Sequence, residues 1–520
     1  MSENTRVVKA AGVVGAATLL SRILGFIRDA VIAWFFGAGF SSDAFIAAFR
    51  IPNLLRRLFA EGSLSSAFIP VFTQYIVRRG QSEAFHLARS AFRLLSVFLI
   101  LVSIGGILLS PWIVKLMAPG FVADKYSLTV TLTRLMLPYI FFVGLVALCM
   151  GILNVLDHFA APALAPVLLN ISIIGSVLII APSLSVPAVG LAVGVLIGGV
   201  LQLALQLPVL WHKGFRFWGK AKLLHPGLRQ VGTLIPPVIL GGAVYQINIV
   251  IGTILGSLLA EGSVTYLYFA DRLVQFPLGV FAIAAATAVL PSLSRQAASQ
   301  DFEALKDTFG HALKFVFFLS IPALVGLIVL REPIVTLLFQ RGEFDAQATR
   351  LTAEALLYYS LGLWAFSAVR IVAATFFAMQ DTRTPVKMAG FSILANIILG
   401  VILMGPLDHS GLALATSLSS ILNLGLLVRA LKNKLGSLGW RSIARSFART
   451  LVSSISMGAA VWAAGLKIFP AQHQTFAGLL GGVAGCVIIG ICTYAGASYV
   501  LKSPELDVVL KEVRKGIGLK

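Results

Sequence analysis

Long apolar runs separated by short polar connections account for most of this chain. About 20 predominantly apolar residues are needed to cross the roughly 30 Å hydrocarbon core of a bilayer. Several runs exceed that length, so we expect tilted or broken helices, with Pro52 inside the second run and Pro277 inside the eighth. We predict an all-α polytopic membrane protein with fourteen transmembrane helices, at residues 10–36, 42–77, 88–117, 127–155, 162–182, 187–211, 229–259, 263–294, 312–330, 349–379, 385–406, 410–430, 447–468 and 475–501.

The first twelve segments contain an internal repeat. Residues 49–74 align with 270–295, and residues 190–202 with 411–423, both at an offset of 221. Asp157 ahead of Pro162 is matched by Asp381 ahead of Pro385. Because six spans separate the copies, the repeat is expected to be parallel, with its axis along the membrane normal and a central cavity between the halves.

This repeat divides the chain into four parts. We expect an N-lobe at 1–220 with spans 1–6 and a C-lobe at 221–440 with spans 7–12. Two extra helices follow at 441–503, and 504–520 is predicted to be an amphipathic cytoplasmic tail. The connection 212–229 mixes basic and aromatic residues, as expected either of contact with anionic headgroups or of an ordinary cytoplasmic linker.

Composition supports a membrane location. The 520 residues are 58% hydrophobic and 12% charged, against about 25% charged in a typical soluble domain. The net charge of +20 does not indicate nucleic-acid binding, because basic residues alternate with apolar spans instead of forming one basic domain. With the N-terminus inside, 27 of the 41 Lys and Arg residues lie in cytoplasmic segments, 6 outside and 8 within spans, which predicts cytoplasmic termini.

Charged residues inside the predicted spans are the candidate site. A charge at the bilayer centre costs about 2.5–3.5 kcal/mol even on the lenient insertion scale, so such residues usually face a water-filled path. Arginines exceed acids among them, which favours an anionic ligand with phosphate-like oxygens that accept bidentate hydrogen bonds. Neutral Arg–Asp pairs between packed helices are the alternative for any single pair. The candidates are Arg22, Arg28, Asp29, Asp43, Arg50, Arg56, Arg57, Glu61, Asp271, Arg272 and Arg370.

Other chemistry has little support in the sequence. Cys149, Cys486 and Cys492 lack metal or redox spacing and are expected to be buried small hydrophobes, and the seven histidines form no metal-ligand pair. Nucleotide-binding and nucleophile motifs are absent, and the acids are scattered among arginines, so we predict a transporter instead of a membrane-bound transferase. We expect no metal and no cofactor.

Several motifs resemble one known family. The stretches S-R-I-L-G-F-I-R-D, P-N-L-L-R-R-L-F-A-E-G, A-D-R-L-V-Q-F-P-L-G-V and D-T-R-T-P-V-K resemble the MurJ (MviN-type) family, flippases of the peptidoglycan precursor lipid II within the multidrug, oligosaccharidyl-lipid and polysaccharide exporter superfamily. The resemblance covers all fourteen spans. It implies alternating access in the bacterial cytoplasmic (inner) membrane, moving lipid II from the cytoplasmic to the periplasmic leaflet for cell-wall synthesis. It also implies a groove for the lipid tail formed by spans 13 and 14.

The resemblance also implies residue roles. Arg22, Arg28, Arg56 and Arg272 would contact the pyrophosphate, with Asp29, Asp43 and Glu61 shaping or gating the cavity. Some members bind sodium through carboxylates in spans 7 and 11, but 231–260 and 386–407 contain no Asp or Glu, leaving Asn396 and Thr416 as partial ligands. We expect a monomer that meets membrane lipids and lipid II but no nucleic acid. The alternatives are a multidrug/cation antiporter, another exporter of polyprenyl-linked saccharides, and a scaffold without transport.

Overall fold

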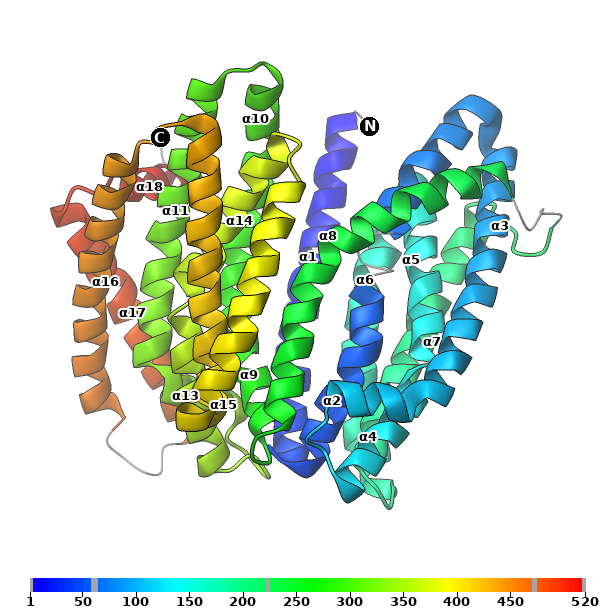
Figure 1. Ribbon diagram of the computed structural model, residues 1–520, viewed down its shortest axis with the longest axis horizontal. Coiled ribbons are helices and arrows are strands. Elements are labelled where there is room, and N and C mark those ends of the chain that lie inside the picture. Colours follow the sequence, from blue (N-terminus) through cyan, green and yellow to red (C-terminus); the bar gives the residue numbers. More distant parts are fainter. Residues whose placement is uncertain (1–2, 58–63, 220–224, 470–474, 517–520) are drawn as a thin grey trace. The chain divides into compact units, whose positions relative to one another are not determined.

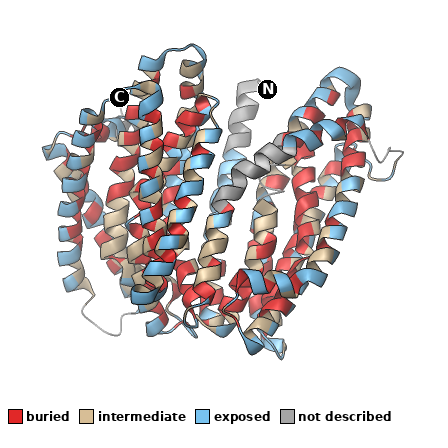
Figure 2. Cartoon of the chain, viewed as in Figure 1, coloured by how far each residue is buried: buried red, intermediate tan, exposed pale blue. Residues whose placement is uncertain are grey.

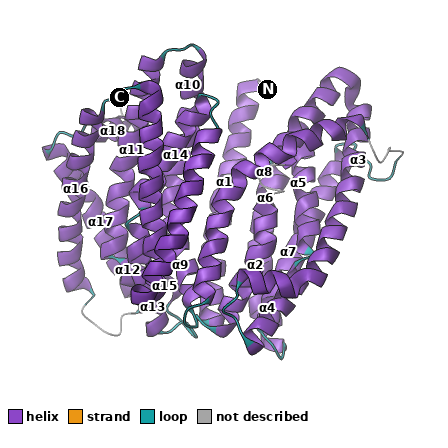
Figure 3. Ribbon diagram, viewed as in Figure 1, coloured by secondary structure: helices purple, strands orange, loops and turns teal. Residues whose placement is uncertain are grey.

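The computed structural model describes residues 3–57, 64–219, 225–469 and 475–516, and the described part is helical without a strand (Figures 1 and 3). This confirms the all-α prediction. Within it, nine helices are long and apolar enough to cross a membrane, or up to ten if one bent pair counts as a single span. The count of fourteen stays a prediction.

The chain forms two compact units. Unit 1 contains residues 1–265 and the short segment Arg341–Phe344, and unit 2 contains the remainder. The helices of unit 1 are α1 (Glu3–Phe36), α2 (Phe40–Leu55), α3 (Leu64–Met117), α4 (Ala123–Met136), α5 (Tyr139–Val155), α6 (Ala160–Gly175), η2 (Ser176–Ile180), η3 (Ala181–Ser183), α7 (Ala188–His212) and α8 (Pro226–Ser257). The first residues of α9 also belong to unit 1.

Unit 2 is built from the later helices. They are α9 (Ser263–Pro277), η4 (Leu278–Ile283), α10 (Ala284–Ala298), α11 (Phe302–Val329), α12 (Arg331–Phe339), α13 (Ala346–Ser360), α14 (Leu363–Ala378), α15 (Arg383–Leu435), α16 (Trp440–Ile468), α17 (Phe476–Val500) and α18 (Pro504–Gly516). The helix α18 is joined to this unit by Leu506, which packs in a core with Phe318 and Met457. Buried residues in both units are red in Figure 2.

Several predicted spans contain a break. The eighth span changes from α-helix to the π-helical η4 directly after Pro277. Proline has no N–H, so it interrupts the regular series of backbone hydrogen bonds of the helix. The tenth bends by 43° between α13 and α14. The connection predicted after residue 77 is helical instead, because α3 continues through a kink at Gly80, where φ is 84° and a Cβ would be strained.

The ends of α5 and α14 have the same backbone geometry. The carbonyl of Leu153 accepts the N–H of His158, and the carbonyl of Phe376 accepts that of Asp381, both at 2.9 Å. The residue before each donor has a positive φ, 57° at Asp157 and 59° at Gln380. Caps of this kind end many helices, so they do not test the predicted match of Asp157 with Asp381, which stays a prediction.

One expectation about the cysteines is also wrong. Cys149 and Cys486 are buried as expected, whereas Cys492 is exposed. The buried face of α17 carries Cys486, Gly490 and Tyr494 at intervals of four residues, and Cys492 lies midway between the last two, on the opposite side of the helix.

Candidate functional site

Arg28 and Asp29 form a buried polar centre where α1 packs on α6. The Arg28 guanidinium donates to Asp29 Oδ1 from Nε at 3.0 Å and from Nη2 at 2.6 Å. Its Nη1 donates to Asn170 Oδ1 at 3.1 Å, and the Asn170 amide donates to the Ser21 carbonyl at 3.0 Å. Arg28 is 7% exposed and Asp29 1%. The structure therefore brings these two predicted residues together and adds Asn170, which sequence reasoning missed because it is apparent only from helix packing.

Two other arginines of unit 1, Arg50 and Arg56, donate hydrogen bonds to oxygen atoms of neighbouring residues. Arg50 Nη1 donates to the Ile249 carbonyl at 2.8 Å and contacts the Thr253 hydroxyl, linking α2 to α8. Arg56 donates to Asn53 Oδ1 from Nε and Nη2, at 3.1 and 2.8 Å. Arg57 is half-buried, and Arg22 is exposed on α1.

Three predicted site residues belong to unit 2. Asp271 and Arg272 are half-buried in α9, and Asp271 Oδ2 accepts from the Gln275 amide one turn later. Arg370 is exposed on α14. Glu61 lies outside the described residues.

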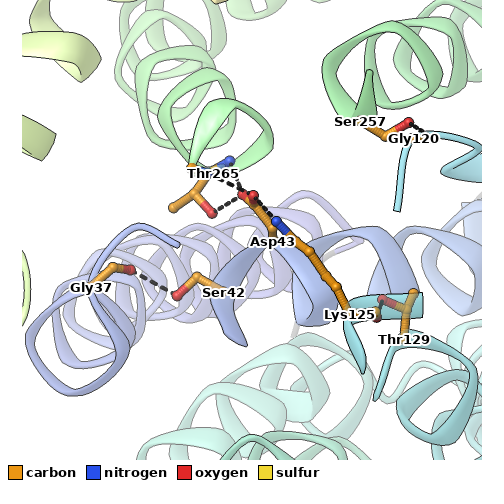
Figure 4. A network of polar contacts seen from close by, with 9 residues as sticks. Gly37, Ser42, Asp43, Gly120, Lys125, Thr129, Ser257 and Thr265 are labelled. Atoms are coloured by element: carbon orange, nitrogen blue, oxygen red, sulfur yellow. Dashed lines mark hydrogen bonds and ion pairs between the residues drawn. The ribbon is translucent and has the colours of Figure 1, made fainter. Parts of the chain in front are cut away.

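Asp43 is the centre of a polar network in unit 1 (Figure 4). Its Oδ1 accepts from the backbone N–H and the hydroxyl of Thr265, at 2.9 and 2.6 Å. Its Oδ2 accepts from the N–H of Gly262 at 2.8 Å and from Lys125 Nζ at 2.7 Å. The carboxylate, 1% exposed, thus caps the N-terminus of α9 from another helix and satisfies N–H groups that the helix cannot satisfy itself.

Close backbone contacts surround this network. The N–H of Glu343 donates to the Trp34 carbonyl at 3.0 Å, which fixes the segment Arg341–Phe344 to the end of α1. Gly37 has a φ of 62°, and a Cβ at this position would collide with the Glu343 carbonyl. Gly120 donates its N–H to Ser257 Oγ at 3.2 Å, and a Cβ there would collide with the Ser257 carbonyl. Only glycine permits these approaches.

Lys125 is the main site residue that sequence reasoning missed. Lys125 lies between the predicted spans 88–117 and 127–155, yet its side chain is only 12% exposed and pairs with Asp43. The ammonium also lies 4.6 Å from the centre of the Phe121 ring. Its position in the first turn of α4, just after the A-P-G-F motif, is the only signal the sequence contains.

Outside the spans, the C-caps of α5 and α14 carry shifted ionisable groups. Partial burial would by itself raise the pKa of Asp381, but hydrogen bonds and charge attraction from Lys434, together with hydrogen bonds from Thr384, lower it to about 2. Burial, followed by the nearby positive charge of Lys213, lowers the pKa of His158.

The two partial sodium ligands of the sequence analysis both lie in α15. Asn396 is buried, and the Thr416 hydroxyl donates to the Leu412 carbonyl of its own helix at 3.0 Å. Among the described residues, no group of three His, Cys, Asp or Glu side chains has the arrangement of a metal site.

Apolar spanning helices with charged groups buried among them define a multi-pass membrane protein of the kind that moves polar or charged groups across a bilayer. The comparisons specify the family. The family model described as "Lipid II flippase MurJ" matches residues 32–483. The chain therefore belongs to the MurJ lipid II flippase family, and the resemblance noted in the motifs is confirmed.

Relatives match over most of their length. A "Probable lipid II flippase MurJ" from Vibrio cholerae is 39% identical over 435 residues, covering 82% of this chain and 83% of the relative. The "Lipid II flippase MurJ" of Burkholderia cenocepacia is 34% identical over 504 residues, covering 94% and 96%.

Solved structures agree with this assignment. A structure titled "Lipid II flippase MurJ, inward closed conformation" has a TM-score of 0.78 at 27% identity and covers 94% of this chain and 98% of its own. An inward-facing multidrug transporter of the MATE family has a TM-score of 0.69 at 16% identity, over 82% of this chain and 98% of its own, which shows a shared fold only.

Proposed function

We propose that this protein is a flippase that moves lipid II from the cytoplasmic to the periplasmic leaflet of a bacterial inner membrane. The observation that carries this proposal is membership of the MurJ family along 32–483, most of the chain. It acts as a transporter and not as an enzyme, it works as a monomer, and it has cytoplasmic termini. Fourteen spans form two parallel six-helix lobes, at 1–220 and 221–440, followed by spans 13 and 14 as a lipid-tail groove.

The pyrophosphate of lipid II is bound by arginines in this proposal. Arg28 is supported best, because its guanidinium is already fixed in orientation by Asp29 and Asn170. Arg22, Arg50, Arg56 and Arg57 contribute from the first lobe, and Arg272 and Arg370 from the second. Guanidinium forks suit phosphate oxygens because they donate two parallel hydrogen bonds.

Asp43 serves as a latch in the same proposal. Its carboxylate joins α2 and α4 to the N-terminus of α9, while Glu343 is joined to the end of α1. Alternating access requires contacts that close one end of a transporter and break when it opens. The Asp43 carboxylate is 1% exposed and its contacts are hydrogen bonds and an ion pair, so they can re-form after breaking.

The membrane potential supplies a driving force for this direction of transport. Moving one charge across the full field is worth about 2.3 kcal/mol per 100 mV, so a doubly charged anion gains about 4–5 kcal/mol per 100 mV when it moves outward from a negative interior. Export of lipid II then needs no ATP.

The test is flipping of lipid II in proteoliposomes with an imposed potential. Wild-type protein is expected to move the lipid, Arg272→Glu to abolish movement, and Arg441→Glu, an exposed residue in the first turn of α16, to leave it unchanged. Full activity of Arg272→Glu would refute the pyrophosphate role. Binding of an organic cation in preference to a pyrophosphate-linked lipid would favour the antiporter alternative.

A further inference from the structure

Basic and aromatic side chains gather where α3 meets the loop after α7. The loop packs on α3 through Phe85 with Phe215 and Phe92 with Phe217, at ring-centre distances of 5.5 and 5.2 Å. Arg93 Nη2 donates to the Gly219 carbonyl at 2.7 Å, which fixes the loop on the helix. We call the surface formed by Arg89, Arg93, Trp211, Arg216 and Trp218 the Arg89 patch.

Arg89 is held in this patch without an acceptor for its buried nitrogen. Its Nε is buried and has no hydrogen-bond partner among the described residues. Its Nη1 lies so close to Gly219 that any Cβ there would collide with it. The single acid in residues 71–93, Glu83, is already bonded to His225 at 3.2 Å, and residues 211–229 contain none. A half-buried guanidinium whose buried Nε lacks an acceptor favours the binding of an anion.

Aromatic rings extend the patch. Arg216 stacks on Trp211 at 4.4 Å, and the Trp211 and Trp218 rings lie 6.3 Å apart. Trp218 is 81% exposed. Tryptophan with an exposed ring and a polar N–H is typical of the headgroup level of a bilayer.

The same face of α3 continues as an apolar stripe. Counting from Arg93, exposed residues follow at intervals of three or four, the spacing of one helix face: Val97, Leu101, Ile104 and Leu108. Exposure reaches 63% at Leu101 and 71% at Leu108. A ligand that bridges the Arg89 patch and this stripe has an anionic head and a long apolar tail.

We propose that the Arg89 patch binds the phosphodiester headgroup of an anionic phospholipid, with an acyl chain along the α3 stripe. Arg89 and Arg216 bind the phosphate, Arg93 holds the loop in place, and the two tryptophans bound the headgroup at the interface. A free phosphate would not use the stripe. The inference is independent of the flippase proposal, since none of these residues belongs to the proposed lipid II site.

The full chain, purified and stripped of lipid, can be tested by native mass spectrometry against phosphatidylglycerol and phosphatidylcholine, without lipid II. Phosphatidylglycerol is expected to bind at least tenfold more tightly. Since each surface arginine contributes about fivefold to affinity for anionic lipid, Arg89→Gln with Arg216→Gln should weaken binding of phosphatidylglycerol by about twentyfold or more. Arg441→Gln removes a matched exposed charge in unit 2 and should have no effect.

Three results would overturn the proposal. The first is equal affinity of the wild-type chain for the two lipids. The second is an equal loss with Arg441→Gln, which would indicate a nonspecific effect of net charge. The third is displacement of phosphatidylglycerol by millimolar glycerophosphate, which lacks acyl chains and would reveal a site for free phosphate. The thermal unfolding midpoint of each variant is measured as a control. A midpoint equal to that of the wild type within error shows that weaker binding of phosphatidylglycerol is not caused by unfolding.

Discussion

Replacing Asp43 by Asn tests whether the carboxylate holds the N-terminus of α9. The change keeps shape but replaces one oxygen by an NH₂ group. If Oδ1 still accepts from Thr265, the new NH₂ faces two donors, the Gly262 N–H and Lys125 Nζ. If the amide is rotated by 180°, its oxygen accepts from Gly262 and Lys125, but its NH₂ then faces the backbone N–H and the hydroxyl of Thr265. Either rotamer leaves buried donors unpaired.

The magnitude follows from the buried ion pair. Breaking such a pair by removing one partner costs about 3–5 kcal/mol, because the remaining charge is buried without compensation. Lys125, with a side chain 12% exposed, is that remaining charge. This energy stabilises the segment around Gly262 and Thr265, and 1.4 kcal/mol corresponds to a factor of ten. Backbone amide exchange in this segment should therefore become roughly 100-fold to 3,000-fold faster in Asp43→Asn.

Hydrogen–deuterium exchange of peptides covering 258–268 measures this directly, with peptides from α16 as an internal reference. Adding Lys125→Met to Asp43→Asn removes the uncompensated ammonium, so the double variant should exchange more slowly than Asp43→Asn alone. Protection of 258–268 that is unchanged in Asp43→Asn would refute the assignment of Asp43 as the group holding α9. Strict additivity of the two changes would refute the pairing with Lys125.

Two further predictions concern close packing and pH. Gly120→Ala should lower the midpoint of thermal unfolding, because the new Cβ would collide with the Ser257 carbonyl. The control Gly105→Ala has open space around it inside α3 and should leave the midpoint unchanged or raise it. Equal effects of the two substitutions would contradict the contact at Gly120. The pKa of Asp381 is depressed to about 2 from 3.8, so its pairing stabilises the fold fully above about pH 4 and loses that contribution as pH falls toward 2. Between pH 5 and 3 the wild-type protein should therefore lose more stability than Lys434→Met, by no more than about 1 kcal/mol because Lys434 is 45% exposed. Parallel pH profiles of the two proteins would exclude the pairing.

The sequence determined the helical membrane architecture and the family. Apolar length is a local property, since each span must satisfy its backbone hydrogen bonds within itself, so the runs alone predict helices. The motifs around Arg28, Arg56 and Arg272 identified the family because they are continuous stretches of chain. Charges inside apolar runs were equally visible, which is why Arg28, Asp29 and Asp43 were found as candidates.

Only the tertiary structure decided which of these charges have partners. Asp43 and Thr265 are 222 residues apart and Arg28 and Asn170 are 142 apart, and no local pattern encodes contacts between helices so distant in the chain. Lys125 lies between two predicted spans, yet packing of α4 beside α2 buries its ammonium against a carboxylate. Burial and pairing depend on which helix faces meet, and that depends on the summed packing of the whole fold instead of on any single segment.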